Sequence, residues 1–313
     1  MATAVLFPGQ GSQSIGMADG WASHPAGRAV LDAASQALGR SIVEGCHDEE
    51  ALKTTDFVQP ALLACDVAAF RVLQASGLTD VAGVAGHSLG EFAALVAADA
   101  VVLADALELV VVRGEAMQRA GEERPGTMVA LLGVDADAAE ALCAAARDGD
   151  ELVVANRNSP VQSVVSGTVA AIERLESSAK EAKIRAVRLP VAGAFHSELM
   201  RPAVQPVLDV LARIAVSDPV FPIAENVTGE LVTDAATLRE LVGRQVVSTV
   251  RWDDGVRALA AAGATRFVEA GPGDVLTKLL KRIDPALTGV AVGSPDDAAA
   301  VVTDRGRSDI LAP

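Results

Sequence analysis

The sequence predicts an α/β protein, in which a large domain built on a parallel sheet carries an inserted small domain of the ferredoxin-like type. Short apolar segments alternate with helical segments over most of the 313 residues, a pattern typical of parallel strands covered by helices on both faces. In the middle of the chain the order becomes strand, helix, strand, strand, helix, strand, which is the split βαβ arrangement. Half of the residues are apolar (50%), so the chain can bury the core that such a protein needs.

The first predicted strand, residues 3–7, ends in a loop with glycines at positions 9 and 11. Proteins of this class place ligand-contacting backbone in such loops, directly after a strand. The loop is not a Walker loop, because no Gly-Lys-Ser/Thr follows, and its glycines do not have the dinucleotide-binding spacing. Helical patterns follow at 26–39 and 60–76, the second with Pro60 in its first turn, where proline is well tolerated.

A nucleophile elbow is predicted where the strand 81–86 turns through Gly86, Ser88 and Gly90 into an alanine-rich helix. Such a turn forces the serine into strained backbone geometry, and side chains at the flanking positions would clash, which explains the glycines. The hydroxyl is then presented above a helix N-terminus, whose free N–H groups favour a developing oxyanion. Strand, turn and helix together indicate an α/β-hydrolase-like large domain with Ser88 as its nucleophile.

A further helix is expected at 103–119, and the small domain follows it. The six predicted elements of that domain lie at residues 128–134, 137–147, 152–156, 162–166, 169–182 and 184–191. Joints rich in glycine or proline flank this segment, near 121–126 and 190–195, and domain boundaries usually fall in such joints. We therefore expect a small domain of residues 125–193, inserted in a large domain made of residues 1–124 and 194–313.

The last third of the chain returns to alternating helices and strands. Helices are predicted at 202–213, 235–246, 252–262 and 275–282, and strands at 220–226 and 266–269. A second glycine-rich loop, residues 271–273, follows the last of these strands. Residues beyond 294 are polar, acidic and poor in large apolar groups, so we expect them to fray.

Charge and hydropathy exclude several classes of function. The formal net charge is −15, whereas a nucleic-acid binder needs clustered lysine and arginine to neutralise phosphates. A local basic face between Arg174 and Arg201 could still meet an acidic partner, although a solvated helix face explains any one of these side chains. No segment approaches the ~18 apolar residues of a membrane helix, and no secretory leader is visible, so we expect no membrane partner and a cytoplasmic location.

Three cysteines, Cys46, Cys65 and Cys143, are far apart and form no C-x-x-C pair. Neither a disulfide framework nor a zinc site is therefore predicted, and no other metal site is expected. Reduced, buried thiols are the better interpretation.

A serine nucleophile needs a base, and the chain offers four histidines, His24, His47, His87 and His196. His87 is next to the serine on the elbow, so its side chain should point away from the hydroxyl and have a structural role. His24 and His47 lie in polar, surface-like segments. His196 lies at the joint between the two domains, where a cleft is expected, and elimination leaves it as the candidate base.

Six short motifs are spaced along the chain between about residue 3 and residue 290. They are Pro8–Gln13, Gly86–Glu91, Arg113–Gly114, Asn156–Pro160, Gly193–His196 and Glu269–Gly273. In order and approximate spacing they resemble the motifs of the malonyl-CoA:acyl carrier protein transacylase family, which includes the acyltransferase domains of polyketide synthases.

The resemblance implies the parts of a catalytic centre. Ser88 would be the nucleophile and His196 its base, and Gln245 matches the position whose backbone carbonyl orients the imidazole where a protease uses a carboxylate. Backbone N–H groups of Gln10 and Leu89 would form the oxyanion hole. Each such donor is typically worth ~2.7–4 kcal/mol of transition-state stabilisation.

The resemblance also implies three substrate-binding residues. Arg113 would receive the malonyl carboxylate, for which a planar guanidinium is better suited than an ammonium. Asn158 matches a position that lines the cleft, although an Asn-Ser-Pro turn is an adequate structural explanation by itself. Phe195, which precedes the candidate base, resembles the malonyl-selecting form of its motif, where methylmalonyl-selecting domains usually carry serine.

As a whole, the resemblance implies a ping-pong acyltransferase that moves a malonyl group from CoA to the phosphopantetheine thiol of an acyl carrier protein through an acyl-Ser88 intermediate. The coenzyme A thioester is then a substrate, and no cofactor is expected. A close alternative is a free-standing polyketide acyltransferase with a different acyl group or carrier.

An alternative of another class is a serine hydrolase or editing thioesterase, in which water accepts the acyl group. An α/β-hydrolase would place an acid between the serine and a late histidine, whereas here a whole small domain intervenes. A non-catalytic scaffold would need no elbow, base and arginine together.

Overall fold

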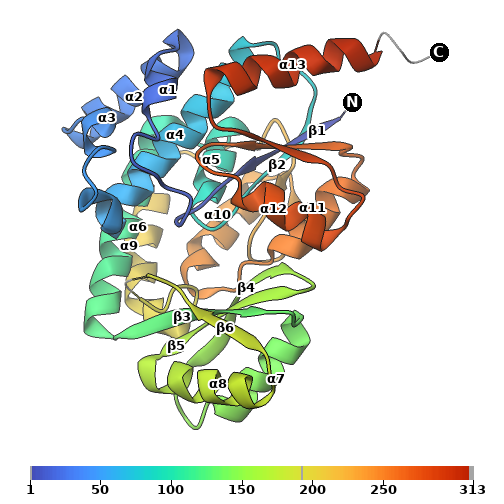
Figure 1. Ribbon diagram of the computed structural model, residues 1–313. Coiled ribbons are helices and arrows are strands. Elements are labelled where there is room, and N and C mark those ends of the chain that lie inside the picture. The colour runs from blue at the N-terminus through green and yellow to red at the C-terminus, as the bar shows by residue number, and fades with distance from the viewer. Residues whose placement is uncertain (1, 192, 310–313) are drawn as a thin grey trace.

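The computed structural model describes residues 2–191 and 193–309, which form two sheets with helices around them (Figure 1). The larger sheet has the order β10-β9-β1-β2-β7-β8. Its strands are β1 (Thr3–Phe7), β2 (Val81–Gly86), β7 (Ile223–Ala224), β8 (Leu231–Val232), β9 (Arg266–Ala270) and β10 (Gly289–Val292). All neighbours pair in parallel except β7 and β8, so the predicted parallel sheet is confirmed with one antiparallel edge.

Two of these strands were not predicted, and one is shorter than expected. β8 has two residues and β10 has four, three of them only partly buried, and both are edge strands. Apolar segments this short do not stand out from loops in the sequence. The strand expected at 220–226 is reduced to Ile223–Ala224. Pro222 precedes it directly, and a proline has no N–H to donate to the ladder.

Helices cover both faces of the larger sheet. They are α1 (Asp19–Ala22), α2 (Pro25–Leu38), α3 (Ile42–Gly45), α4 (Thr55–Ala75), α5 (Gly90–Ala97), α6 (Leu103–Glu123), α9 (Val204–Leu211), α10 (Ala235–Arg244), α11 (Trp252–Ala261), α12 (Val275–Ile283) and α13 (Pro295–Asp309), with 3-10 turns η1 (Ala51–Lys53), η2 (Glu198–Ala203) and η3 (Gln245–Val247).

The central strand β1 divides the core between the two faces. Val5 and Phe7 pack into the cluster that contains α4 and α5, while Ala4 and Leu6 pack into the cluster that contains α11 and α12. All four side chains are completely buried. Successive side chains of a strand point to opposite faces, so a strand covered on both sides must be apolar at every position, as β1 is.

Helix α4 begins at Thr55, and the prediction that it starts at Pro60 is wrong. Pro60 lies inside the helix, where its missing N–H leaves the carbonyl of Asp56 without its intrahelical donor. The guanidinium of Arg40 donates to that oxygen at 3.4 Å and also lies over the ring of Phe57, 4.4 Å from the centroid. A partner from another segment therefore compensates for the interior proline.

The second sheet is antiparallel and has the order β4-β5-β3-β6. Its elements are β3 (Gly126–Leu132), α7 (Ala136–Ala146), β4 (Leu152–Ser159), β5 (Gln162–Thr168), α8 (Val169–Glu181) and β6 (Arg185–Arg188). Both helices pack on one face of the sheet around a separate apolar cluster, at the bottom of Figure 1. The predicted ferredoxin-like βαββαβ arrangement is confirmed.

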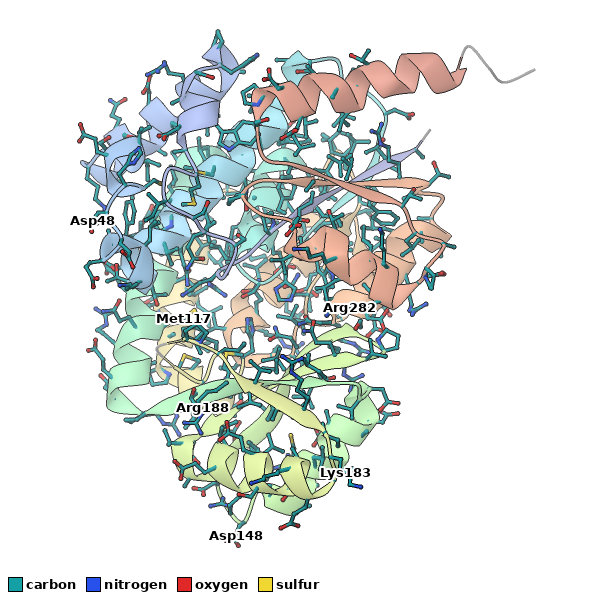
Figure 2. The ribbon with its side chains drawn as sticks, viewed as in Figure 1. Asp48, Met117, Asp148, Lys183, Arg188 and Arg282 are labelled. Atoms are coloured by element: carbon teal, nitrogen blue, oxygen red, sulfur yellow. The ribbon has the colours of Figure 1, made fainter. Side chains whose placement is uncertain are left out.

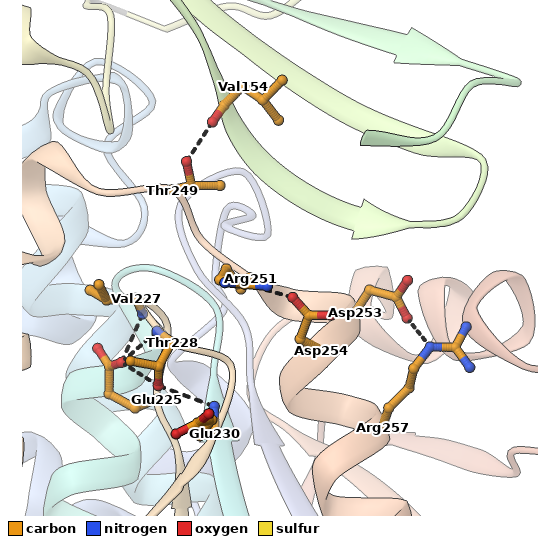
Figure 3. Close-up of polar contacts among 10 residues, drawn as sticks. All are labelled: Val154, Glu225, Val227, Thr228, Glu230, Thr249, Arg251, Asp253, Asp254 and Arg257. Atoms are coloured by element: carbon orange, nitrogen blue, oxygen red, sulfur yellow. Dashed lines mark hydrogen bonds and ion pairs between the residues drawn. The ribbon is translucent and has the colours of Figure 1, made fainter. Parts of the chain in front are cut away.

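The segment before α11 joins the two sheets through backbone hydrogen bonds. Val250 donates to the carbonyl of Ala155 at 2.8 Å and accepts from the N–H of Arg157 at 2.9 Å. Beside it, the hydroxyl of Thr249 donates to the carbonyl of Val154 at 2.7 Å (Figure 3). Edge strand β4 is thereby paired with a segment of the large domain, which fixes one sheet against the other.

The possible basic face of the small domain is largely neutralised. Arg174, Arg188 and Arg201 form ion pairs with Asp150, Glu176 and Glu198, respectively. Lys180, Lys183 and Arg185 line a shallow depression together with Glu176 (Figure 2 labels Lys183 and Arg188). Solvated side chains with local partners account for this segment.

The three cysteines are free and buried, as expected. No helix in residues 2–191 or 193–309 is long and apolar enough to cross a membrane. The same part of the chain holds no cluster of three or more metal-ligating side chains.

The prediction that the chain frays beyond residue 294 is wrong for residues 295–309, which form α13; residues 310–313 lie outside the described residues. α13 crosses the top of the molecule next to α4 (Figure 1). Ala298 is completely buried and Val301 is 4% exposed. Small apolar side chains on one face are sufficient to dock this helix. The prediction of fraying had assumed that large apolar residues would be needed.

Replacing Ala298 by aspartate tests whether α13 is docked. The new carboxyl group would be buried without a partner and would be neutralised, so we expect Ala298→Asp to lower the free energy of unfolding by roughly 1–3 kcal/mol. Ala300, on the same helix, is exposed, and Ala300→Asp should change the free energy of unfolding by less than about 0.5 kcal/mol. Urea denaturation followed by circular dichroism measures both; equal effects would mean that α13 does not pack on the core.

Candidate active site

Ser88 lies at the tip of the turn between β2 and α5 with a φ of 52°. A positive φ is strained for a residue with a Cβ atom and places the side chain at the apex of the turn. The flanking glycines are required by close packing: a Cβ atom on Gly86 would lie 1.9 Å from the backbone of Gly90, and one on Gly90 would lie 2.1 Å from the carbonyl oxygen of Phe7. The strand, turn and helix of the predicted elbow are therefore present.

The hydroxyl of Ser88 and Nε2 of His196 are 2.7 Å apart. On the other side of the ring, Nδ1 is 3.0 Å from the carbonyl oxygens of both Gln245 and Ser248. Carbonyl oxygens can only accept, so Nδ1 must carry the proton and the neutral imidazole has its lone pair on Nε2. That lone pair faces the serine hydroxyl, as a general base requires.

His196 is buried beside a positive charge. Burial lowers the pKa of His196 to about 3, and the guanidinium of Arg113 contributes in the same direction. Both effects disfavour the imidazolium form. The ring is therefore neutral and able to accept a proton throughout the physiological pH range.

The guanidinium of Arg113 lies next to the serine, although its side chain is only 1% exposed. Nη2 donates to the hydroxyl oxygen of Ser88 at 3.2 Å and to Oε1 of Gln245 at 3.0 Å, and Nη1 donates to Oε1 of Gln59 at 2.8 Å. Burial lowers the pKa of Arg113 to about 10, so it still carries its charge at neutral pH. Within the described part of the chain, its Nε–H has no acceptor.

Local ion pairing does not explain this arginine. Glu108 pairs with Arg213 at 2.6 Å on the surface, and Glu115 is exposed on the opposite side of α6 from the buried guanidinium. Arg113 has only neutral amides and a hydroxyl as hydrogen-bond partners. A buried cation with an unused donor can bind an anion.

The loop after β1 lies against the elbow. A Cβ atom on Gly9 would be 2.3 Å from the carbonyl oxygen of His87 and 3.7 Å from the backbone nitrogen of Leu89. The N–H groups of Gln10 and Leu89 have no hydrogen-bond acceptor among the described residues, and both residues line the same pocket. Two free N–H groups beside a serine hydroxyl can bind an oxyanion.

A pocket of about 410 Å³ opens in front of Ser88 between the two domains. The large domain contributes Arg113 and Met117, and the latter lies where α6 approaches the small domain (Figure 2). Met128 and Val164 of the small domain complete its apolar wall. The pocket combines an apolar lining with a few polar groups around one hydroxyl, as small-molecule sites do.

The remaining predicted residues also line the pocket. Asn158 is 8% exposed, and its Oδ1 lies 2.9 Å from Nε2 of His87. The ring of His87 packs against Trp252 with centroids 5.4 Å apart, in keeping with a structural role. Phe195 is 7% exposed and directly precedes the base. The structure thus brings together all eight residues singled out from the sequence.

The other two histidines lie elsewhere. His24 caps α2 by accepting from the N–H of Ala26 at 3.2 Å, and His47 contacts Asp19 at 2.9 Å on the surface.

Three further residues of the site have no role predicted from the sequence, although Glu91 ends one of the six motifs. Gln59 holds Arg113, while Glu91 and Asn226 lie beneath the elbow, each at most 3% exposed. A signal existed for Glu91, since it is the one charged residue before the apolar run 92–97 of a helix that is buried throughout. Gln59 and Asn226 carry no such signal, because Gln59 directly precedes the predicted helix 60–76 and Asn226 ends the predicted strand 220–226, and polar residues are ordinary at such places.

Comparison with known proteins agrees with this geometry. The family described as acyl transferase domain matches residues 5–291. A malonyl CoA-acyl carrier protein transacylase of Salmonella typhimurium is 40% identical over 304 residues, which cover 96% of this chain and 98% of that protein.

Solved structures are similar over the same range. An acyl-carrier-protein S-malonyltransferase from Burkholderia pseudomallei 1710b superimposes with a TM-score of 0.93 at 40% identity, covering 97% of this chain and 100% of that one. A malonyl-transacylase in complex with a type II polyketide synthase acyl-carrier protein gives a TM-score of 0.93 at 36% identity, covering 97% and 100%. With an acyl transferase domain over nearly its whole length and relatives at 40% identity, this chain belongs to the malonyl CoA-acyl carrier protein transacylase family.

Proposed function

We propose that this protein transfers a malonyl group from coenzyme A to the phosphopantetheine thiol of an acyl carrier protein, with Ser88 carrying the group in between. The observation that carries the proposal is the buried guanidinium of Arg113, 3.2 Å from the serine hydroxyl and with a free Nε–H. An acyl group held on Ser88 places its distal end close to this cation. A three-carbon acyl group that ends in a carboxylate fits this arrangement.

In the first half-reaction, His196 takes the proton of Ser88 as the serine oxygen attacks the thioester carbonyl. The C–O bond forms, and the resulting oxyanion accepts hydrogen bonds from the N–H groups of Gln10 and Leu89. The C–S bond then breaks, and coenzyme A leaves as a thiol with the proton from His196. The second half-reaction is the reverse with the carrier thiol as nucleophile, which restores the serine hydroxyl.

The same cation that binds the substrate also adjusts the base. In the free protein, the charge of Arg113 lowers the pKa of His196. A malonyl carboxylate on Arg113 offsets this charge, so the bound substrate raises the basicity of the imidazole. Substrates without the carboxylate would lack this effect.

The proposal needs no metal or cofactor, because the residues of the site supply nucleophile, base and oxyanion donors. A relative of the same fold is described in complex with a polyketide acyl-carrier protein, which supports a carrier protein as the acceptor. Whether the carrier belongs to fatty acid or polyketide synthesis does not change the chemistry at Ser88. A cytoplasmic location, where coenzyme A thioesters and carrier proteins occur together, is part of the proposal.

A covalent intermediate on Ser88 is the direct test. Brief incubation with malonyl-CoA and no carrier protein should add one malonyl group to the intact protein, on the peptide that contains Ser88, and Ser88→Ala should remain unlabelled. Intact and peptide mass spectrometry measure this. A hydrolase would instead release free malonate without any thiol acceptor, and this result would replace the transferase proposal.

Replacing Arg113 separates malonyl recognition from general acyl transfer. We expect Arg113→Ala to lose roughly 2–5 kcal/mol of malonyl transfer, the usual cost of removing one partner of a buried charged pair, while acetyl transfer holds or rises. Arg113→Lys should restore malonyl transfer only in part, because an ammonium lacks the planar fork. Acylation rates of Ser88 from malonyl-CoA and acetyl-CoA decide the matter; equal losses for both donors, together with a lower melting temperature, would make Arg113 structural.

The pH dependence of acylation tests the base. Because the pKa of His196 is lowered to about 3, its neutral form persists in acid, and kcat/KM for Ser88 acylation, which reports the free enzyme, should stay flat from about pH 8 to about pH 5. Activity should fall only at lower pH, as the ring becomes protonated. Circular dichroism at each pH controls for unfolding, and a decline centred near pH 6.5 would show that His196 titrates like an exposed histidine.

A further inference from the structure

Glu91 lies beneath the nucleophile elbow, in the first turn of α5, and is completely buried. It does not line the pocket in front of Ser88, so it cannot touch a substrate there. Its two carboxyl oxygens nevertheless contact groups that hold the site. Oε1 accepts from the backbone N–H of Asn226 at 2.8 Å and from its side-chain amide at 3.1 Å, and Oε2 accepts from the side-chain amide of Gln245.

The orientation of both amides is fixed by their other partners. Oδ1 of Asn226 accepts from the N–H of Ser88 at 2.7 Å, so its NH2 group must face Glu91 and the carbonyl of Gly86, 2.8 Å away. Oε1 of Gln245 accepts from Arg113, so its NH2 group must face Glu91 and the carbonyl of Ser88, 2.8 Å away. Each amide therefore turns donors toward Glu91.

This set of donors defines the charge state of Glu91. Every hydrogen-bond partner of its side chain is an N–H group, and a protonated carboxyl would direct its O–H at another donor. Burial, and after it the nearby Glu225, raise the pKa of Glu91 well above its usual range, although the N–H donors and Arg113 act in the opposite direction. The hydrogen-bond pattern is satisfied only by the carboxylate.

Arg113 and Glu91 are thus a cation and an anion joined through one neutral side chain. Gln245 accepts from the guanidinium with one end of its amide and donates to the carboxylate with the other. A direct ion pair would occupy the guanidinium. With an amide between the charges, the cation is balanced electrostatically while its remaining N–H donors stay available.

We propose that Glu91 is a positioning residue for the transfer reaction: through Asn226 it holds the elbow that presents Ser88, and through Gln245 it balances and orients Arg113 without blocking it. This inference rests on the proposed function only for the identity of the acyl group. The part that concerns the elbow holds for any acyl donor that Ser88 accepts.

The test is single-turnover acylation of Ser88 in Glu91→Gln. The new amide would turn an NH2 group toward existing donors, and a displaced elbow should slow acylation from both malonyl-CoA and acetyl-CoA by a factor on the order of 10². The apparent Kd of malonyl-CoA should be unchanged or lower, because Arg113 keeps its charge and loses its counter-charge. Rapid-quench mass spectrometry over a range of donor concentrations separates the rate constant from the Kd.

Glu225→Gln is the matched control. Glu225 is also a buried carboxylate, 1% exposed, and it lies next to Asn226, but its hydrogen bonds go to Val227 and Thr228 (Figure 3). Acylation by this variant should stay within about twofold of the wild type, even if its stability falls. Equal slowing in both variants would mean that loss of any buried charge in this region is sufficient, and would overturn the proposal.

A charge-exchanged variant, Glu91→Gln with Gln245→Glu, remains informative if Glu91→Gln does not fold. It retains one amide and one carboxylate but places the carboxylate directly on Arg113. We expect the apparent Kd for malonyl-CoA to rise about tenfold or more relative to that for acetyl-CoA in the same variant, since a direct ion pair competes only with the anionic substrate. Unchanged malonyl affinity would show that the intervening amide has no function. Malonyl labelling of Ser88 in the wild-type protein tests the proposed function by itself, so a failure of that function can be told apart from a failure of the role of Glu91.

Discussion

A positive charge buried beside the nucleophile is the constraint on which the rest of the site depends. A guanidinium that is 1% exposed costs free energy unless polar groups surround it, and here Gln59 and Gln245 are recruited from α4 and η3 to do so. Its charge adds to the effect of burial in lowering the pKa of the base, and its Nε–H donor has no acceptor among the described residues. One side chain therefore acts on the base and is also the proposed group for binding an anionic acyl group.

The inserted small domain matters to this site because of where it joins the large one. His196 follows the return from the small domain, and the carbonyls of Gln245 and Ser248 that fix its tautomer belong to the segment leading to α11. That same segment pairs with edge strand β4 through Val250. One segment of the large domain therefore both orients the base through its carbonyls and pairs with the edge of the small domain.

Much of this could be predicted from the sequence, and the failures have physical causes. The elbow, the alternating strands and the βαββαβ order follow from local patterns, and glycines at 86 and 90 signal close backbone approach directly. Pro60 is not the start of α4, as the sequence suggested, because Arg40 supplies a donor to the carbonyl of Asp56. No local sequence pattern encodes this contact from another segment. α13 was missed because its docking depends on how well small side chains fit α4, rather than on hydrophobicity alone.

The sequence by itself determined the fold class and the family and singled out the candidate nucleophile and base, since each rests on short segments whose residue types have strong local preferences. Only the tertiary structure decided how the charges of the site are balanced. Glu91 lies 135 positions before Asn226 and 154 positions before Gln245 in the chain, and it bonds to both. The amides of Asn226 and Gln245 can be oriented only when all of their partners are in place. Buried polar networks are defined by mutual satisfaction of donors and acceptors, a condition that exists only in the folded protein.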